Sequence, residues 1–265
     1  MNLRVLVVSL LLASSVAAQT FQHVTIKEID ATTGVANAIA KVPHAAAAWA
    51  AWMVPTAGRS VYCNRCTLDG SRDGFTISDD DGMPFASQLV LVVRLEDGKL
   101  RRVRFFNAAC PIEGKGETVH LLTNAGVESS IEYLRSGLRD ADKEGEILAA
   151  LSLHEHPTVV PLLIDLARHD ASTKIRQDAL FWLGQKAGVK AAAELRRAVD
   201  DDPNEDVKEH AVFAISQLPR ERSVPMLIDL VKTHKSRAVR KRAMFWLAQT
   251  SDPRALDLIE EILAR

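Results

Sequence analysis

Three cysteines are the residues whose type and spacing offer the most chemistry. Cys63 and Cys66 are separated by two residues, and Cys110 follows much later in the chain. We expect a disulfide that joins Cys110 to Cys63 or Cys66, because an export signal, described below, places the chain in an oxidising compartment. Two alternatives stay open. Cys63 and Cys66 can act as a redox pair, or the cysteines can bind zinc with a fourth ligand such as His44 or His120.

The segment after the first two cysteines has the start of a calcium-binding loop. Asp69, Ser71 and Asp73 alternate and are followed by Gly74. Asp80 stands at the twelfth position, where loops of this type carry a bidentate glutamate. Because the match is partial, we favour a polar loop between strands and keep a weak calcium site as the alternative.

Sequence motifs for common kinds of catalysis are missing from the chain. It has no Gly-x-Ser-x-Gly elbow, no Walker loop, no Rossmann fingerprint and no His-Glu-x-x-His zinc motif. We therefore expect no cofactor, and a non-catalytic function is the favoured interpretation.

Composition narrows the class of partner. The 265 residues include 33 Lys and Arg against 34 Asp and Glu, a formal net charge of −1. Such a chain has no overall positive field to hold nucleic acid or an anionic membrane. Its 47% hydrophobic and 25% charged residues are typical of a folded protein, and its length has room for two domains.

The N-terminus has the pattern of a secretory signal peptide. Arg4 precedes an apolar run over 5–12, and Val16 and Ala18 stand at the −3 and −1 positions of a cleavage site before Gln19. The run is far shorter than the ~20 residues that span a bilayer. We therefore expect residues 1–18 to be removed and the mature chain, without a transmembrane segment, to be periplasmic or extracellular.

Residues 19–115 are expected to form a small α+β domain with an antiparallel sheet. Branched apolar residues over 89–95 and alternating residues over 100–106 flank Asp97-Gly98, a pair typical of a tight hairpin turn. The Ala-rich stretch over 34–48 predicts a helix that Pro43 interrupts.

Residues 116–265 show an internal repeat. Beyond residue 140, similar residues recur at a spacing of 32. The columns include Ile175, Val207, Val239; Arg176, Lys208, Arg240; Ala179, Ala211, Ala243; Phe181, Phe213, Phe245; and Leu183, Ile215, Leu247. Within one unit, Ile175, Ala179 and Leu183 share one helical face, and Pro161 or Pro225 suits the first turn of another helix. Each unit is therefore expected to be a pair of helices that stacks on its neighbours.

A two-helix unit of this length, with Val-Arg opening one helix and an Ala- and Leu-rich centre, resembles the HEAT repeats of the short bacterial type called PBS-lyase-like. The resemblance covers more than half of the chain and implies an all-α superhelical solenoid of four to five units. It implies an exported, non-catalytic adaptor that binds another protein, here an unknown envelope protein. The alternatives within the family are an oxidoreductase or metal-dependent enzyme and a lyase for bilins or other small ligands.

The metal-dependent alternative can be tested on the sequence. HEAT-type deoxyhypusine hydroxylases carry His-Glu pairs on the first helices of their repeats. The corresponding stretches here are Lys208-Glu209-His210, Arg176-Gln177-Asp178 and Arg240-Lys241-Arg242. His154-Glu155 is a true pair but falls at a helix end, so the resemblance does not extend to a di-iron site.

Two sets of residues are candidate binding surfaces. The repeat register places charged residues of the second helices toward a concave face: Asp165, Arg168, Arg197, Asp229, Lys232 and Glu261. Their mixed signs favour a folded polar partner over nucleic acid, and the alternative is that they only keep the surface soluble. The Phe-Trp pairs at 181–182 and 245–246 are expected in the core, with an aromatic groove as the alternative.

Overall fold

The structure is a computed structural model that describes residues 20–43, 47–56, 60–63, 66–69, 75–78, 88–108, 110–139, 144–186 and 188–264. Side chains at 60–63, 75–78, 189 and 263 are not described. The expected signal peptide therefore lies outside the described residues, as do His44, Ser71, Asp73, Asp80 and the side chain of Cys63. The chain divides into two compact units, Met1–Glu155 and His156–Arg265.

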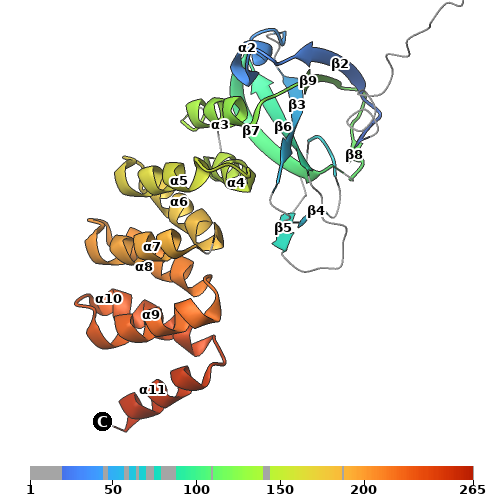
Figure 1. Ribbon diagram of the computed structural model, residues 1–265. Helices are drawn as coiled ribbons and strands as arrows, with labels where there is room; N and C mark the ends of the chain where they lie inside the picture. The colour runs from blue at the N-terminus through green and yellow to red at the C-terminus, as the bar shows by residue number, and fades with distance from the viewer. Residues whose placement is uncertain are drawn as a thin grey trace, which may run out of the picture. The chain divides into compact units, whose positions relative to one another are not determined.

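The N-terminal unit contains a five-stranded sheet (Figure 1). Its strand order is β2 (Thr25–Asp30), β9 (Thr118–Thr123), β3 (Ala48–Pro55), β6 (Gln88–Glu96) and β7 (Lys99–Asn107). The hairpin of β6 and β7 confirms the sequence prediction, since Asp97 and Gly98 both have positive φ, 50° and 76°. The sheet is not wholly antiparallel as expected, because β9 pairs in parallel with both β2 and β3.

Short elements surround this sheet. Strand β1 (Phe21–Gln22) pairs with β8 (Ile112–Glu113), and β4 (Ser60–Cys63) pairs with β5 (Phe75–Ser78). The helix expected over 34–48 is reduced to α2 (Val35–Ile39), because the residues from Ala48 onward enter the sheet as β3.

Cys66 and Cys110 lie on neighbouring segments of the N-terminal unit. Glu113 N–H donates to the carbonyl of Cys66 over 2.7 Å, and Leu68 N–H donates to the carbonyl of Glu113 over 2.9 Å. Cys110 precedes this same short strand, and both cysteines are half-buried. The expected disulfide of Cys110 with Cys63 or Cys66 stays a prediction.

The sheet buries both of its faces. One face holds an apolar cluster that includes Trp49, Val92 and Phe106. Trp52 belongs to the opposite face, and its ring meets the edge of Tyr133 in α3 (Val127–Ser136) at 6.0 Å between centroids. Helix α4 (Glu144–Leu153) contacts β7, where Glu146 accepts hydrogen bonds from Arg102 and from the backbone N–H of Val103. The two helices therefore belong to the sheet's unit.

A chain of buried hydrogen bonds connects the sheet to both helices. Trp52 Nε1–H donates to Ser130 Oγ over 2.7 Å, and Ser130 Oγ lies 2.9 Å from His154 Nε2. His154 Nδ1 lies 2.8 Å from the carbonyl of Ala150, which can only accept, so Nδ1 carries the proton. On a neutral ring Nε2 then accepts the Ser130 hydroxyl proton. Ser130 and His154 are both fully buried, so the pair holds elements together and is closed to substrates.

The unit boundary differs from the one expected after residue 115. That position falls just before β9, which occupies the interior of the sheet between β2 and β3. The next two helices pack on the sheet, so the N-terminal unit continues to Glu155. His154 follows the last residue of α4, as expected for a helix end, but it is buried and not a solvated polar end.

The C-terminal unit is helical. Its helices are α5 (Val159–His169), α6 (Thr173–Lys186), α7 (Val189–Asp201), α8 (Glu205–Ser216), α9 (Arg220–Thr233), α10 (Arg237–Ala248) and α11 (Pro253–Leu263). Helices α5 with α6, α7 with α8 and α9 with α10 form antiparallel pairs, as Figure 1 shows. Among the described residues, none of the helices is long and apolar enough to cross a membrane.

The repeat columns explain how these pairs pack. Ile175, Val207 and Val239 are buried on α6, α8 and α10. Gly184 in α6 sits where a Cβ would lie 2.8 Å from the carbonyl oxygen of Ala214, so its missing side chain lets α6 approach α8 closely. Asn204 accepts from the first backbone N–H groups of α8 and fixes where that helix begins.

Substituting Ser130 tests the buried hydrogen-bond chain. Ser130→Ala leaves the Trp52 N–H without an acceptor and His154 Nε2 without a donor, and should lower the free energy of unfolding by about 1–3 kcal/mol. Denaturant titration of the purified protein measures this. Ser136→Ala is the matched control on the same helix, because its exposed hydroxyl donates only to the Tyr133 carbonyl one turn earlier. Equal effects of the two substitutions would contradict the role of the chain.

Candidate binding surfaces of the repeat unit

Most of the charged residues predicted as a binding face form ion pairs from helix to helix. Arg168 of α5 binds Glu194 of α7, with Nε and Oε2 2.8 Å apart. Lys232 of α9 lies 3.2 Å from Glu261 of α11. Helices α7 and α9 are joined in the same way by an ion pair between Arg196 and Asp229.

The two remaining predicted residues also have partners. Arg197 donates to Glu194 over 3.0 Å, and Asp165 lies 3.0 Å from His169 on the same helix. Hydrogen bonds from Arg168, and then from Arg197, hold the pKa of Glu194 below its ordinary value. The structure thus places five of the six predicted residues in ion pairs of the C-terminal unit and gives Asp165 a hydrogen-bond partner in His169. Glu194 and Arg196 also belong to this network, and neither was predicted from the sequence.

A second set of basic residues donates hydrogen bonds to backbone carbonyls. In the column of Arg176, Lys208 and Arg240, each side chain donates to a carbonyl at the end of the preceding helix. Arg176 also makes a two-pronged contact with Asp202, Nε to Oδ2 at 3.0 Å and Nη2 to Oδ1 at 3.2 Å. Arg176 and Asp202 are both buried, so this pair fixes α6 against the end of α7.

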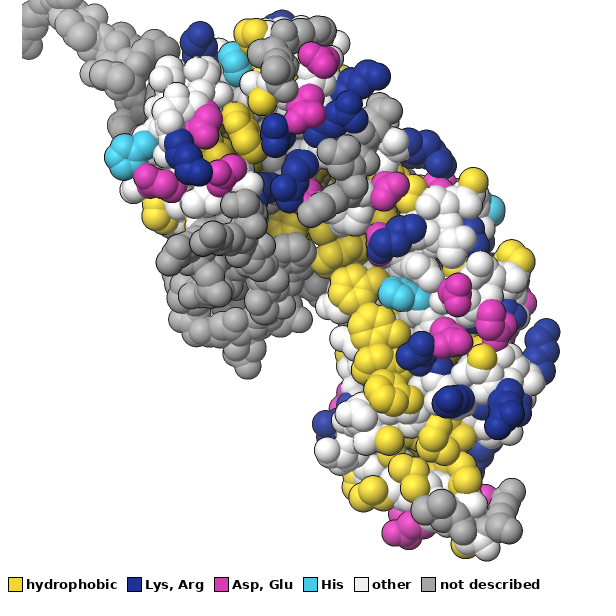
Figure 2. Space-filling model, turned by 180° about the vertical axis from the view of Figure 1, so that it is seen from behind, with side chains coloured by type: hydrophobic (Ala, Val, Ile, Leu, Met, Phe, Trp, Pro, Cys, Tyr) yellow, Lys and Arg dark blue, Asp and Glu magenta, His cyan; other side chains and the backbone are white. Residues whose placement is uncertain are grey.

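Aromatic side chains form a row across α6, α8 and α10. The rings of Phe181 and Phe213 stack with centroids 5.9 Å apart, and those of Phe213 and Trp246 are 4.9 Å apart. Phe245 continues the row from Trp246 at 5.0 Å and is 50% exposed. Figure 2 shows a continuous band of hydrophobic side chains over the repeat unit, on the side away from the viewer of Figure 1.

The aromatic row corrects the expectation that both Phe-Trp pairs are core. Only Trp182 is buried as expected, whereas Phe181 and Trp246 are half-buried and Phe245 is exposed. Phe213 fills the gap that the missing middle tryptophan leaves, because it lies between Phe181 and Trp246 in space. The alternative of an aromatic surface therefore describes this face better.

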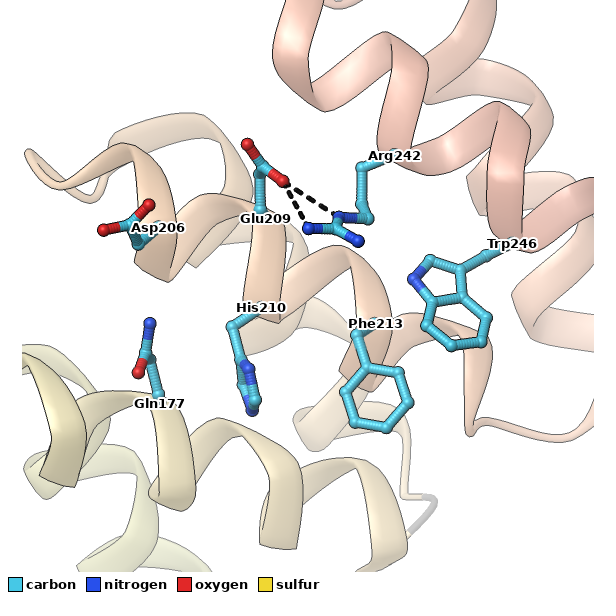
Figure 3. A pocket seen from close by; sticks show the side chains of 7 residues that line it. All are labelled: Gln177, Asp206, Glu209, His210, Phe213, Arg242 and Trp246. Atoms are coloured by element: carbon cyan, nitrogen blue, oxygen red, sulfur yellow. Dashed lines mark hydrogen bonds and ion pairs between the residues drawn. The ribbon is translucent and has the colours of Figure 1, made fainter.

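A cavity of about 460 Å³ opens beside this row (Figure 3). One helix from each of three successive helix pairs lines it: Gln177 comes from α6; Asp206, Glu209, His210 and Phe213 from α8; Arg242 and Trp246 from α10. In Figure 3 the side chains of Gln177, His210 and Trp246 point toward the space between the helices. The cavity therefore forms only where helix pairs stack on one another, and no single helix pair contains it.

The charges that line the cavity are unequal. Glu209 Oε2 binds Arg242, 2.9 Å from Nε and 2.7 Å from Nη2. The exposed carboxylate of Asp206 makes no ion pair with any described residue. Burial lowers the pKa of His210, against an opposing influence of Asp178, so its imidazole is neutral at pH 7. Two carboxylates and one guanidinium leave one net negative charge.

Trp246 brings an unsatisfied polar atom to this cavity. Its Nε1 is buried and has no hydrogen-bond acceptor among the described residues. A buried N–H without an acceptor is costly, and an arriving ligand that supplies an acceptor removes that cost. The arrangement can therefore bind a group with both an acceptor and an apolar or cationic part.

From the sequence, several residues that line the cavity were considered only as possible iron ligands. A different signal was present: Glu209 and His210 stand four and three residues before Phe213, so all three share one helical face. Arg242 and Trp246 are likewise one turn apart on the next repeat.

Metal chemistry finds no support among the described side chains. No group of three or more His, Cys, Asp or Glu residues in the described ranges is arranged to hold a metal ion. Asp69, the first residue of the candidate calcium loop, binds Lys115 Nζ at 2.6 Å.

Comparison with known proteins agrees with the helix pairs. Stacked pairs of this kind define a helical repeat protein, and the family model for HEAT repeats matches residues 131–215 and 192–265, just over half of the chain. The chain therefore belongs to the HEAT-repeat family. No curated protein matches it.

Among solved structures, the chain is similar to the complex of CpcE and CpcF of phycocyanin lyase from Nostoc sp. PCC7120. The two share 15% sequence identity, with a TM-score of 0.37, over 52% of this chain and 89% of that one.

Substitutions of two arginines compare how much a buried ion pair and an exposed ion pair contribute to stability. Arg176→Met leaves Asp202 as a buried, unpaired carboxylate and should lower the free energy of unfolding by about 3–5 kcal/mol. Arg196→Met removes a partly exposed arginine of the helix-to-helix network and should cost at most about 1 kcal/mol. Thermal or denaturant unfolding of both variants gives the comparison. A larger loss for Arg196→Met would show that the exposed network is the stronger connection between repeats.

Proposed function

We propose that the protein is an exported, non-catalytic scaffold that binds another envelope protein through its HEAT repeats. In this proposal the repeats form a superhelical solenoid with a period of 32 residues. The carrying observation is the aromatic row with its cavity, which spans α6, α8 and α10 and leaves Phe245 half exposed. Contiguous exposed apolar surface on a folded protein is typical of an interaction site.

The two faces of the repeat unit support different roles. On the helices α5, α7, α9 and α11, the charged side chains already have partners, so a ligand there would have to displace ion pairs. The face of α6, α8 and α10 instead offers tryptophan, phenylalanine and arginine side chains, which are enriched where binding energy concentrates. We therefore place the docking surface on α6, α8 and α10, and not on the six charged residues suggested by the repeat register.

Site-specific crosslinking tests this placement. A photoreactive phenylalanine at position 245 should capture one defined envelope protein in intact cells, because the side chain there is exposed within the row. Leu256 of α11 is the matched control, since it is equally apolar and 58% exposed but lies outside the row. The product should disappear in the Phe213→Ala background.

Capture from position 256 alone would move the docking surface to the last helix. Capture from neither position in cells that contain the protein would contradict the scaffold function.

Export and the disulfide form one further part of the proposal. Mass spectrometry of the protein taken from the cell envelope, without reductant, should find a chain that begins at Gln19 and a peptide pair linked through Cys110. In this proposal the partner is Cys66, whose backbone is hydrogen-bonded to the strand that follows Cys110, so Cys66→Ser should abolish the linked pair and Cys63→Ser should preserve it. An intact Met1 would contradict export, and three alkylated thiols would contradict the disulfide.

A further inference from the structure

We propose that the cavity between α6, α8 and α10 receives the side chain of a lysine or arginine from the partner protein. The inference rests on the proposed scaffold function and names the chemistry of that same surface. It joins three features of the cavity: aromatic walls, an excess of negative charge, and the indole N–H of Trp246.

The walls of the cavity suit a cation. Phe213 and Trp246 meet at an interplanar angle of 39°, and His210 meets the Phe213 ring at 70° with centroids 5.5 Å apart. The three rings therefore form a corner with differently oriented faces. A lysine ammonium or an arginine guanidinium is attracted to such faces, tryptophan most of all, and its methylene stem packs against the same rings.

The charges select a cation over an anion. Arg242 is the only guanidinium or ammonium group that lines the described cavity, and its charge is matched by Glu209 at 2.7 Å. Asp206 is then the charge left to attract a ligand. An acidic ligand would face this carboxylate and would have to draw Arg242 away from Glu209.

The indole of Trp246 indicates a peptide rather than a free small cation. A quaternary ammonium ion offers no acceptor and would leave the buried Nε1–H unsatisfied. An extended segment of a protein presents a backbone carbonyl close to each side chain. One such segment can give its carbonyl to Trp246 once the indole ring turns to expose its buried N–H, while its basic side chain enters the aromatic corner.

The experiment follows the indole N–H of Trp246 by NMR. The chain has four tryptophans, so the ¹⁵N-labelled protein gives a small set of indole signals, and Trp246→Phe assigns the one of interest. The probes are acetyl-Gly-Arg-Gly-amide and acetyl-Gly-Lys-Gly-amide, with norleucine and glutamate at the central position as controls. Tetramethylammonium chloride is the small-cation probe.

The expected result is a saturable shift of the Trp246 signal with the arginine and lysine peptides and none with the norleucine or glutamate peptides. Asp206→Asn should weaken the binding of the arginine peptide about three- to tenfold. The matched control is Asp201→Asn, because Asp201 is an exposed carboxylate near the start of α8 that does not line the cavity, and it should change the binding less than twofold.

Three results would overturn the proposal. These are a preference for the glutamate peptide, equal shifts with the norleucine peptide, and a response to tetramethylammonium without a response to either basic peptide. The outcome is separable from that of the crosslinking test. A captured partner with no basic preference removes only this inference, whereas a basic preference without any captured partner removes the scaffold function.

Discussion

Each helix pair of the repeat unit buries its apolar face only against its neighbours, and the rest of that unit depends on this constraint. The columns of Ile175, Val207 and Val239 are buried because α6, α8 and α10 stack side by side. Close stacking also requires small residues, and Gly184 lies where any Cβ would meet the backbone of α8. A buried charge near the stack then needs a partner across the junction, as Arg176 has in Asp202.

This constraint explains which parts of the fold could be predicted from the sequence. A buried position keeps a similar residue type in each repeat, so the columns of similar residues predicted the helix pairs. Asp97-Gly98 predicted the hairpin, because this pair suits the backbone angles of a tight turn. Strand β9 was missed because its partners β2 and β3 lie far away in the sequence and pair in parallel, without a turn between them. The unit boundary was misplaced for the same reason.

The site was harder to predict, because its contacts cross from one repeat to the next. Arg242 meets Glu209 at a separation of 33 residues, and Arg168 meets Glu194 at 26, so neither pair falls on the period of 32. A column of recurring residues compares equivalent positions of different repeats. It does not show which non-equivalent positions are in contact. The charged residues predicted from the sequence lie on α5, α7, α9 and α11, but their partners were visible only in the structure.

Stacking also accounts for the difference between the two faces. Long charged side chains on α5, α7, α9 and α11 can reach the next helix, so that face satisfies itself. On α6, α8 and α10 one such pair, Glu209 with Arg242, lies beside rigid rings, which stack on one another but cannot accept the indole N–H of Trp246 or neutralise Asp206. The indole N–H of Trp246, which lacks an acceptor among the described residues, and the carboxylate of Asp206, which lacks a cation among them, thus remain beside the same apolar corner. A single extended segment with a basic side chain, as proposed above, would satisfy both at once.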